Sequence, residues 1–144
     1  MPIINLKKSI IPSCDVDSLE KLKELVKSTY SVKGVGAYKI GFELVIPFGI
    51  EKVVKTIREI TKLPIIYDHQ KAGTDIPAMG EKFMKACKGF DAVILFPQAG
   101  PETEIAWIKS AQQAKMNVII GGEMTHKSFL KTMMASSTTM PLKE

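Results

Sequence analysis

The sequence predicts an α/β domain built on a parallel sheet of five βα units. Short apolar runs recur along the chain, a segment with apolar residues at helical spacing follows each of the first four, and polar or charged residues end several of them. The runs cover residues 9–14, 35–44, 63–67, 90–96 and 116–120. Strands that alternate with helices are typical of a parallel sheet with right-handed crossovers. Five units leave two architectures open, an open doubly wound sheet and an incomplete eight-stranded barrel.

Helix starts and apolar spacing predict four helices between these runs. They cover about 19–26, 50–60, 76–87 and 105–114. The first is expected to begin with a side-chain cap from Asp17 or Ser18, since both residue types favour this position. The third opens with a proline, which the first turn of a helix tolerates.

The chain is long enough for one domain with a sizeable core. We expect residues 1–131 to form this domain as a partial barrel. Residues 132–144 contain the run Ser-Ser-Thr-Thr and have no periodic apolar content, so they are expected to form an irregular C-terminal tail.

Composition and charge argue against several classes of protein. The net charge is +5, but it comes from scattered lysines with Arg58 as the one arginine, whereas nucleic-acid sites favour clustered basic residues with aromatics. No apolar run approaches the roughly 18 residues of a membrane span. The start of the chain lacks the layout of a secretion signal. We therefore expect a cytoplasmic protein that binds neither nucleic acid nor membrane, with Cys14 and Cys87 as free thiols.

Charged residues gather where the third strand is predicted to end. Asp68, Lys71 and Asp75 follow the run Ile65-Ile66-Tyr67, and Lys39 lies inside the preceding run. The carboxyl ends of parallel strands are where such folds bind ligands. A lysine inside a strand that is buried on both faces is unusual for a surface residue. The pattern predicts an alternating Lys/Asp site for an anionic substrate.

Four segments in the same order as in a known family carry a resemblance to orotidine 5′-phosphate decarboxylase, archaeal type. Residues 68–77, DHQKAGTDIP, resemble the family's strand-3 signature, in which an Asp, a Lys and a second Asp are often followed by Ile-Pro. Residues 37–41 resemble the strand-2 segment with its lysine, residues 12–15 the end of strand 1, and residues 122–126 the strand-5 segment. The resemblance implies a (β/α)8 TIM barrel of the ribulose-phosphate-binding type.

The resemblance also implies a reaction and roles for residues. The family removes CO2 from C6 of a phosphorylated pyrimidine nucleotide without a metal or organic cofactor, so neither is expected here. Lys71 would stabilise the carbanion and deliver the proton, Asp68 would crowd the departing carboxylate, and Lys39 would hold Asp68 and touch the ribose. Asp75 would reach into a partner's site, which implies a homodimer or higher homo-oligomer. Asp15, Ile76 and Thr125 are expected to bind the substrate.

The sequence departs from the family pattern in three ways. The family spaces its motif as Asp-x-Lys-x-x-Asp, whereas the spacings from Asp68 to Lys71 and from Lys71 to Asp75 are longer here. Met79 stands nearest the position where a Thr commonly follows. Strands 6 to 8, which bind the phosphate in the family, have no counterpart in this sequence. The sequence therefore resembles a family barrel that is truncated after the fifth βα unit. An open partial barrel leaves sheet edges uncovered, which predicts association with another copy.

Two other functions remain open at this point. One is a Mg²⁺-dependent sugar-phosphate lyase of the hexulose-phosphate synthase or ketogulonate-phosphate decarboxylase group, although such enzymes generally carry an acid where Lys39 stands. The other is a non-catalytic remnant that keeps the sheet but cannot grip phosphate. Asp75 also suits a helix N-cap. His69 and His126 are interpreted as loop residues, since their spacing does not resemble a metal site.

Overall fold

The computed structural model describes residues 3–69, 73–96 and 98–121. In this part of the chain it shows a four-stranded, fully parallel sheet in the order β1-β2-β3-β4. The strands are β1 (Tyr38–Ile40), β2 (Ile65–Asp68), β3 (Ala92–Leu95) and β4 (Asn117–Ile120). Strands that are consecutive in sequence are neighbours in space, whereas a doubly wound sheet reverses its order partway across. The strand order therefore identifies a partial barrel and excludes the doubly wound alternative.

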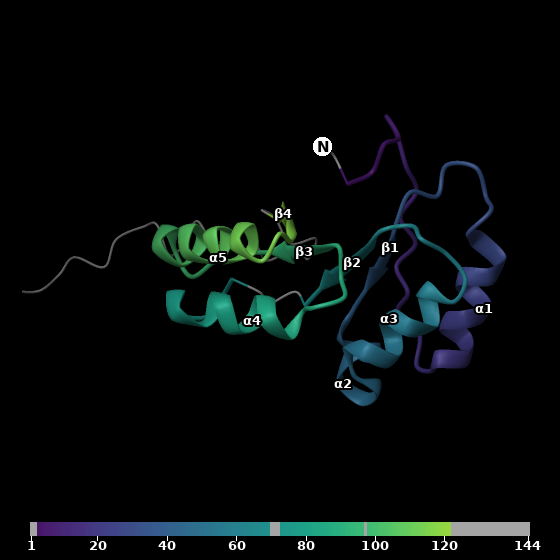
Figure 1. Cartoon of the computed structure of the whole chain (residues 1–144), viewed down its shortest axis with the longest axis horizontal. Helices are drawn as coiled ribbons and strands as arrows, with labels where there is room; N and C mark the ends of the chain where they lie inside the picture. Colours follow the sequence, from purple (N-terminus) through teal and green to yellow (C-terminus); the bar gives the residue numbers. More distant parts are fainter. Residues whose placement is uncertain (1–2, 70–72, 97, 122–144) are drawn as a thin grey trace, which may run out of the picture.

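Helices pack in two groups at either end of the sheet. Figure 1 shows α4 and α5 side by side at one end and α1, α2 and α3 together at the other. Their bounds are α1 (Leu19–Thr29), α2 (Phe42–Phe48), α3 (Ile50–Arg58), the 3₁₀ turn η1 (Pro77–Met79), α4 (Gly80–Ala86) and α5 (Pro101–Gln113). Ser18 caps α1 by accepting a hydrogen bond from the backbone N–H of Lys21 at 3.2 Å, as predicted. None of the helices in the described ranges has the length and apolar content needed to cross a membrane.

The first predicted strand, residues 9–14, meets the edge of β1 through two isolated parallel bridges instead of a continuous ladder. Ile10 bridges Val35 and Ser13 bridges Lys39, so one segment advances three residues while the other advances four. An extra residue of this kind interrupts strand pairing. Pro12 lies between the bridges and has no backbone N–H to donate. The first predicted strand therefore occupies its expected place beside β1 and runs parallel to it, but it pairs through two bridges and is not one of the four ladder strands of the sheet.

The second predicted strand also ends earlier than its sequence indicates. Residues 35–44 were expected to be extended, but β1 stops at Ile40 and α2 begins at Phe42. Pro47, which argues against a helix in the sequence, lies inside α2. Leu44 is fully buried whereas Ile46 is 72% exposed, so α2 is held by packing on one side. Tertiary packing overrides local propensity in this segment.

The sheet separates a large core from a small one. The large core lies between the sheet and the helices and receives alternate strand residues such as Tyr38, Ile65 and Tyr67. On the opposite face, Ala37, Ile66 and Ala92 form a small cluster with Ile3, Ile4 and Ile94 packed against it. Successive residues of a strand point to opposite faces. Lys39 and Asp68 therefore share the face of the small cluster.

The C-terminus of α5 carries a lysine in a conformation that glycine normally supplies. The N–H groups of Lys115 and Met116 donate to the carbonyls of Gln112 and Ala111, which closes the helix in a Schellman-type motif. Lys115 has φ +56°, in the left-handed region, and it is the one non-glycine residue with positive φ in the described part of the chain. A residue with a Cβ adopts this conformation at a cost.

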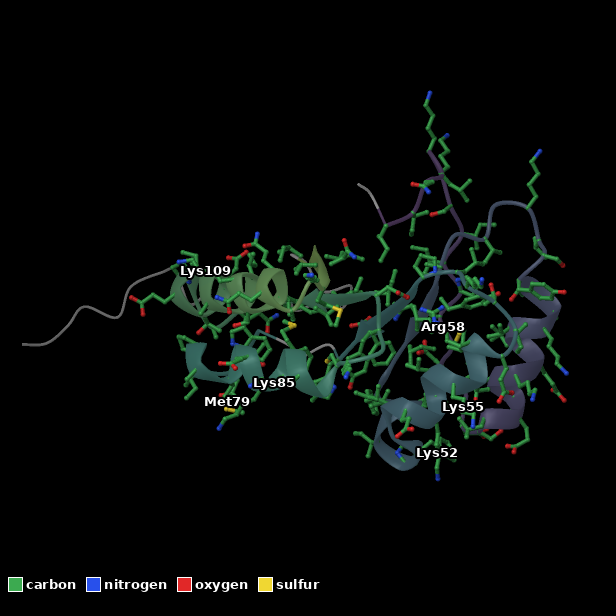
Figure 2. The ribbon with its side chains drawn as sticks, in the orientation of Figure 1. Lys52, Lys55, Arg58, Met79, Lys85 and Lys109 are labelled. Atoms are coloured by element: carbon green, nitrogen blue, oxygen red, sulfur yellow. The ribbon has the colours of Figure 1, made fainter. Side chains whose placement is uncertain are left out.

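We predict that Lys115→Gly raises the free energy of unfolding by about 1 kcal/mol, because glycine removes the strain at this position. Lys109, on the exposed surface of α5 (Figure 2), provides a matched control. Lys109→Gly should lower the free energy of unfolding by about 1 kcal/mol, because glycine is unfavourable inside a helix. Chemical denaturation of both variants measures the effect. Equal destabilisation by both substitutions would contradict the prediction.

Candidate active site

A lysine and an aspartate form an ion pair at the carboxyl end of two neighbouring strands. Lys39 is the central residue of β1 and Asp68 is the last residue of β2, with Lys39 in register with Ile66. The Lys39 Nζ donates to Asp68 Oδ2 at 2.9 Å. Only 25% of the Lys39 side chain and 11% of the Asp68 side chain are exposed. The structure thus brings together two of the four predicted catalytic residues.

Asp15 joins this pair around a small pocket. Asp15, Lys39 and Asp68 all line a cavity of about 230 Å³. Gly41 lies between the two aspartates, because a Cβ built on it would lie 3.4 Å from Asp15 Oδ1 and 4.0 Å from the Asp68 carbonyl oxygen. Three residues predicted from three separate segments therefore line one pocket at the carboxyl edge of the sheet.

The pocket also contains two residues that the sequence interpretation missed. Phe42 and Glu43 line it from the first turn of α2. The sequence pattern predicts a longer strand that includes both residues. In such a strand Glu43 would share the face of Lys39 but lie about four residues further along. The signal available in the sequence was Gly41, a common start for a new element directly after a strand.

The remaining predicted site residues lie outside this pocket or outside the described residues. Lys71 and Thr125 belong to segments that the structure does not describe. Asp75 is exposed, and its Oδ1 accepts a hydrogen bond from the N–H of the next residue, Ile76, at 2.7 Å. Neither Asp75 nor Ile76 lines the pocket, and Ile76 is 61% exposed. Asp75 forms no side-chain cap for η1 or α4.

Tyr67 and His69 flank Asp68 and contact each other. The Tyr67 Oη and the His69 Nδ1 are 2.6 Å apart. Burial raises the pKa of the Tyr67 hydroxyl to about 12, and electrostatic interactions with Cys87 and Asp68 add to this effect. The tyrosine hydroxyl therefore keeps its proton at neutral pH and can donate it to the ring nitrogen of His69.

Cys14 lies directly before Asp15, but its thiol is buried. Its backbone N–H donates to the carbonyl of Lys39 at 2.9 Å, which ties the first segment to β1. Burial raises the pKa of the Cys14 thiol to about 12, with a smaller contribution from the charge of Asp15. Burial alone raises the pKa of Cys87 to about 12. Neither cysteine is an activated nucleophile, since that role needs a thiolate.

A larger groove of about 900 Å³ lies at the opposite, amino end of the strands. Its acids are paired, Glu81 with Lys85 at 2.7 Å and Asp91 with Arg58. Lys85 lies in the last turn of α4 and Lys115 follows α5, where helix dipoles favour cations. Ligands of parallel sheets bind at the carboxyl edge, so the smaller pocket is the candidate active site.

A parallel sheet of consecutive strands, with a lysine–aspartate pair at its carboxyl edge, defines a partial (β/α)-barrel domain of the kind that carries enzyme sites. The particular family follows from a family model that matches residues 8–141. The chain belongs to the orotidine 5′-phosphate decarboxylase / HUMPS family. The match includes Lys71 and Thr125 and extends into the segment predicted to be a tail.

Solved structures of orotidine 5′-monophosphate decarboxylases resemble the chain. The enzyme of Methanocaldococcus jannaschii in complex with the inhibitor BMP is 26% identical over 89% of this chain and 58% of that chain, with a TM-score of 0.78. The enzyme of Pyrococcus horikoshii is 22% identical over 85% of this chain and 55% of that chain, with a TM-score of 0.70, and this likeness concerns the fold alone. The chain thus spans less than two thirds of the length of these relatives. No curated protein matches it.

We predict that both thiols resist modification in the folded protein, because burial keeps them protonated and covered. Ellman's reagent at about pH 8 should label neither Cys14 nor Cys87 until guanidinium chloride unfolds the chain. An unfolded chain ionises its thiols from about pH 9, whereas the folded chain keeps them protonated to about pH 12. Stability should therefore fall as the pH rises through this interval. Rapid labelling of the native chain would show that the thiols are accessible.

Proposed function

We propose that this chain carries the site of an orotidine 5′-phosphate decarboxylase, which converts orotidine monophosphate to uridine monophosphate and CO2. The observation that carries the proposal is the Lys39–Asp68 ion pair at 2.9 Å, in one pocket with Asp15 at the carboxyl edge of the sheet. Membership of the family and the 26% identical decarboxylase structure support it. The protein would then be a cytoplasmic carboxy-lyase of pyrimidine biosynthesis that uses no cofactor.

The proposed chemistry uses charge alone. Loss of CO2 leaves carbanion character at C6 of the pyrimidine, and the ammonium group of Lys71 would stabilise it and then donate the proton. Asp68 would stand beside the departing carboxylate, whose negative charge it disfavours in the ground state. Asp68 forms an ion pair with Lys39 at 2.9 Å, and its negative charge would attract the ammonium group of Lys71 in the same way.

Other residues would bind the substrate and complete the assembly. Asp15 faces the pocket and would accept hydrogen bonds from the ribose, while Thr125 and Ile76 would contact the base. Asp75 is exposed, which suits a residue that reaches into the site of a second copy. The active form would then be a homodimer or a higher homo-oligomer.

One observation favours a Mg²⁺-dependent sugar-phosphate lyase as a second candidate. Glu43 follows β1 and lines the same pocket as Asp15 and Asp68, although within the described residues no three such side chains lie close enough together to hold a metal ion. Carboxylate oxygens are the ligands that Mg²⁺ prefers. Lys39 favours the first candidate, because its ammonium occupies the position in β1 where such lyases generally carry an acid.

A non-catalytic role has its own supporting observation. The chain covers 58% of the Methanocaldococcus jannaschii enzyme, and the family resemblance assigns phosphate binding to strands beyond the fifth unit. Such a remnant would keep the Lys39–Asp68 pair without turnover.

We predict that the chain decarboxylates orotidine monophosphate and that Lys71→Ala lowers kcat by about 10²- to 10⁴-fold, the contribution typical of a positioned proton donor. Loss of the substrate's ultraviolet absorbance measures turnover, with and without EDTA. Lys55→Ala on α3 (Figure 2), an exposed lysine outside the pocket, is the matched control and should be as active as the unmodified chain.

Turnover of a sugar phosphate that requires added Mg²⁺ would support the second candidate. A folded chain that shows neither turnover nor calorimetric binding of uridine monophosphate would support the remnant.

We predict that Asp75 acts across a subunit boundary. Lys71→Ala and Asp75→Ala should each be inactive alone, but subunits mixed after unfolding and refolding should recover up to about one quarter of the original activity, because half of the dimers are hybrids with one intact site. Sedimentation velocity should show a dimer at micromolar concentration. A monodisperse monomer, or a mixture that stays inactive, would place Asp75 outside the partner's site.

A further inference from the structure

Four aromatic side chains form one cluster between the end of β2 and helices α4 and α5. Tyr67 stacks on Phe90, with ring centroids 4.8 Å apart and an interplanar angle of 5°. Phe83 of α4 also stacks on Tyr67, with ring centroids 6.2 Å apart, and its ring centroid lies 5.1 Å from that of Trp107 of α5. Tyr67, Phe90 and Trp107 are each less than 9% exposed. The cluster therefore links β2 rigidly to α4 and α5.

Both polar atoms of this cluster are directed to the same segment. The Tyr67 Oη lies 2.6 Å from His69 Nδ1, and Trp107 Nε1–H donates to the carbonyl of Ile76 at 3.1 Å. A buried tyrosine hydroxyl or indole N–H normally requires a partner, and leaving one unpaired is costly. His69 and Ile76 mark the two ends of the segment, so one rigid cluster holds both ends.

Each anchored residue directly follows a proposed catalytic carboxylate. His69 follows Asp68, and Ile76 follows Asp75, whose Oδ1 accepts the Ile76 N–H at 2.7 Å. Lys71 lies between them in sequence. The distance between the two anchors thus constrains how Asp68 and Asp75 are placed relative to each other.

Two glycines reinforce the arrangement through close backbone approaches. A Cβ on Gly73, which has φ +86°, would lie 3.1 Å from the carbonyl oxygen of Phe96, so the backbone of Gly73 lies directly against the residue that follows β3. A Cβ on Gly80 would lie 3.1 Å from the Trp107 Cα, which shows how closely α4 and α5 pack (Figure 1). The position of the indole is fixed by this packing.

We infer that Tyr67 and Trp107 are positioning residues, which set the positions of Asp68 and Asp75 relative to each other through hydrogen bonds to His69 and Ile76. Neither residue is among those that line the candidate active-site pocket. The inference rests on the proposed function only where it concerns the effect of Tyr67 and Trp107 on turnover. The anchoring of the segment can be tested without any activity.

The test compares Tyr67→Phe and Trp107→Phe with Tyr38→Phe. Each of the first two variants removes one anchoring hydrogen bond and keeps a six-membered aromatic ring. Tyr38 is the matched control, because it is fully buried in β1 and its hydroxyl bonds to Thr29 Oγ1 at 2.8 Å, on the side of α1. The two tyrosine variants each lose one buried hydroxyl and should lose comparable stability, whereas Trp107→Phe also leaves a cavity in the core and should lose more.

Backbone ¹⁵N relaxation at Gly73–Ile76 is the readout that a general loss of stability would not change. We expect order parameters there to fall from about 0.85 to below about 0.6 in Tyr67→Phe and Trp107→Phe, and to stay unchanged in Tyr38→Phe. His69→Asn, which keeps an acceptor near the position of Nδ1, should behave as the unmodified chain, whereas His69→Leu should match Tyr67→Phe. Equal order parameters at these residues in the anchor variants and in Tyr38→Phe would overturn the inference.

Turnover provides the second readout and separates this inference from the proposed function. Where the unmodified chain decarboxylates orotidine monophosphate, kcat should fall about 10- to 100-fold in both anchor variants with a smaller change in KM, as a small displacement of the reacting groups produces. An unchanged kcat in variants with lowered order parameters would overturn the positioning role. Where the unmodified chain shows no turnover, the proposed function fails and the relaxation data alone decide whether the segment is anchored. If Tyr67→Phe fails to fold, the order parameters of Trp107→Phe and of the two His69 variants test the inference in its place.

Discussion

The ion pair between Lys39 and Asp68 is the interaction on which the candidate site depends. Removing both charges from water costs several kcal/mol per ion, which mutual attraction and hydrogen bonding must offset. The pairing of β1 with β2 supplies the necessary geometry, because the parallel register places Lys39 beside Ile66 and two residues from Asp68 on the same face. A shift of one residue in this register would move Lys39 to the helical face and separate the charges. The ion pair of the candidate site therefore forms only if β1 and β2 keep this register.

The two cores on either side of the sheet maintain that register. Tyr38 and Ile40 flank Lys39 and are fully buried in the helical core, so β1 cannot slip without exposing them. On the other face, Ile3 and Ile4 from the start of the described chain pack against the cluster of Ala37, Ile66 and Ala92. A closed barrel would fill this face with side chains from its other strands. The N-terminal segment covers the amino half of the face and leaves Lys39 and Asp68 lining an open pocket.

The sequence predicted the features that rest on local patterns and missed those that rest on packing. Ser18 capping α1 and the position of Lys39 inside a strand follow from residue type and period, and the structure confirms both. The helix α2 was missed because its aliphatic residues and Pro47 favour extended structure, and only the burial of Leu44 explains the helix. Glu43 was missed as a pocket residue for the same reason. The interrupted pairing of the first strand depends on the spacing of its bridges, which no periodicity reports.

Strand β2 connects the charge network directly to the hydrophobic core. Its four residues alternate, so that Ile65 and Tyr67 enter the helical core while Ile66 and Asp68 face the other side. Tyr67 is thus adjacent in sequence to the carboxylate that pairs with Lys39, and its ring stacks with those of Phe83 and Phe90. Because interiors are close-packed, a change in volume in this stack displaces backbone as well as side chains. Since the peptide that carries the Tyr67 ring also carries Asp68, the packing of α4 against the sheet and the position of the carboxylate cannot vary independently.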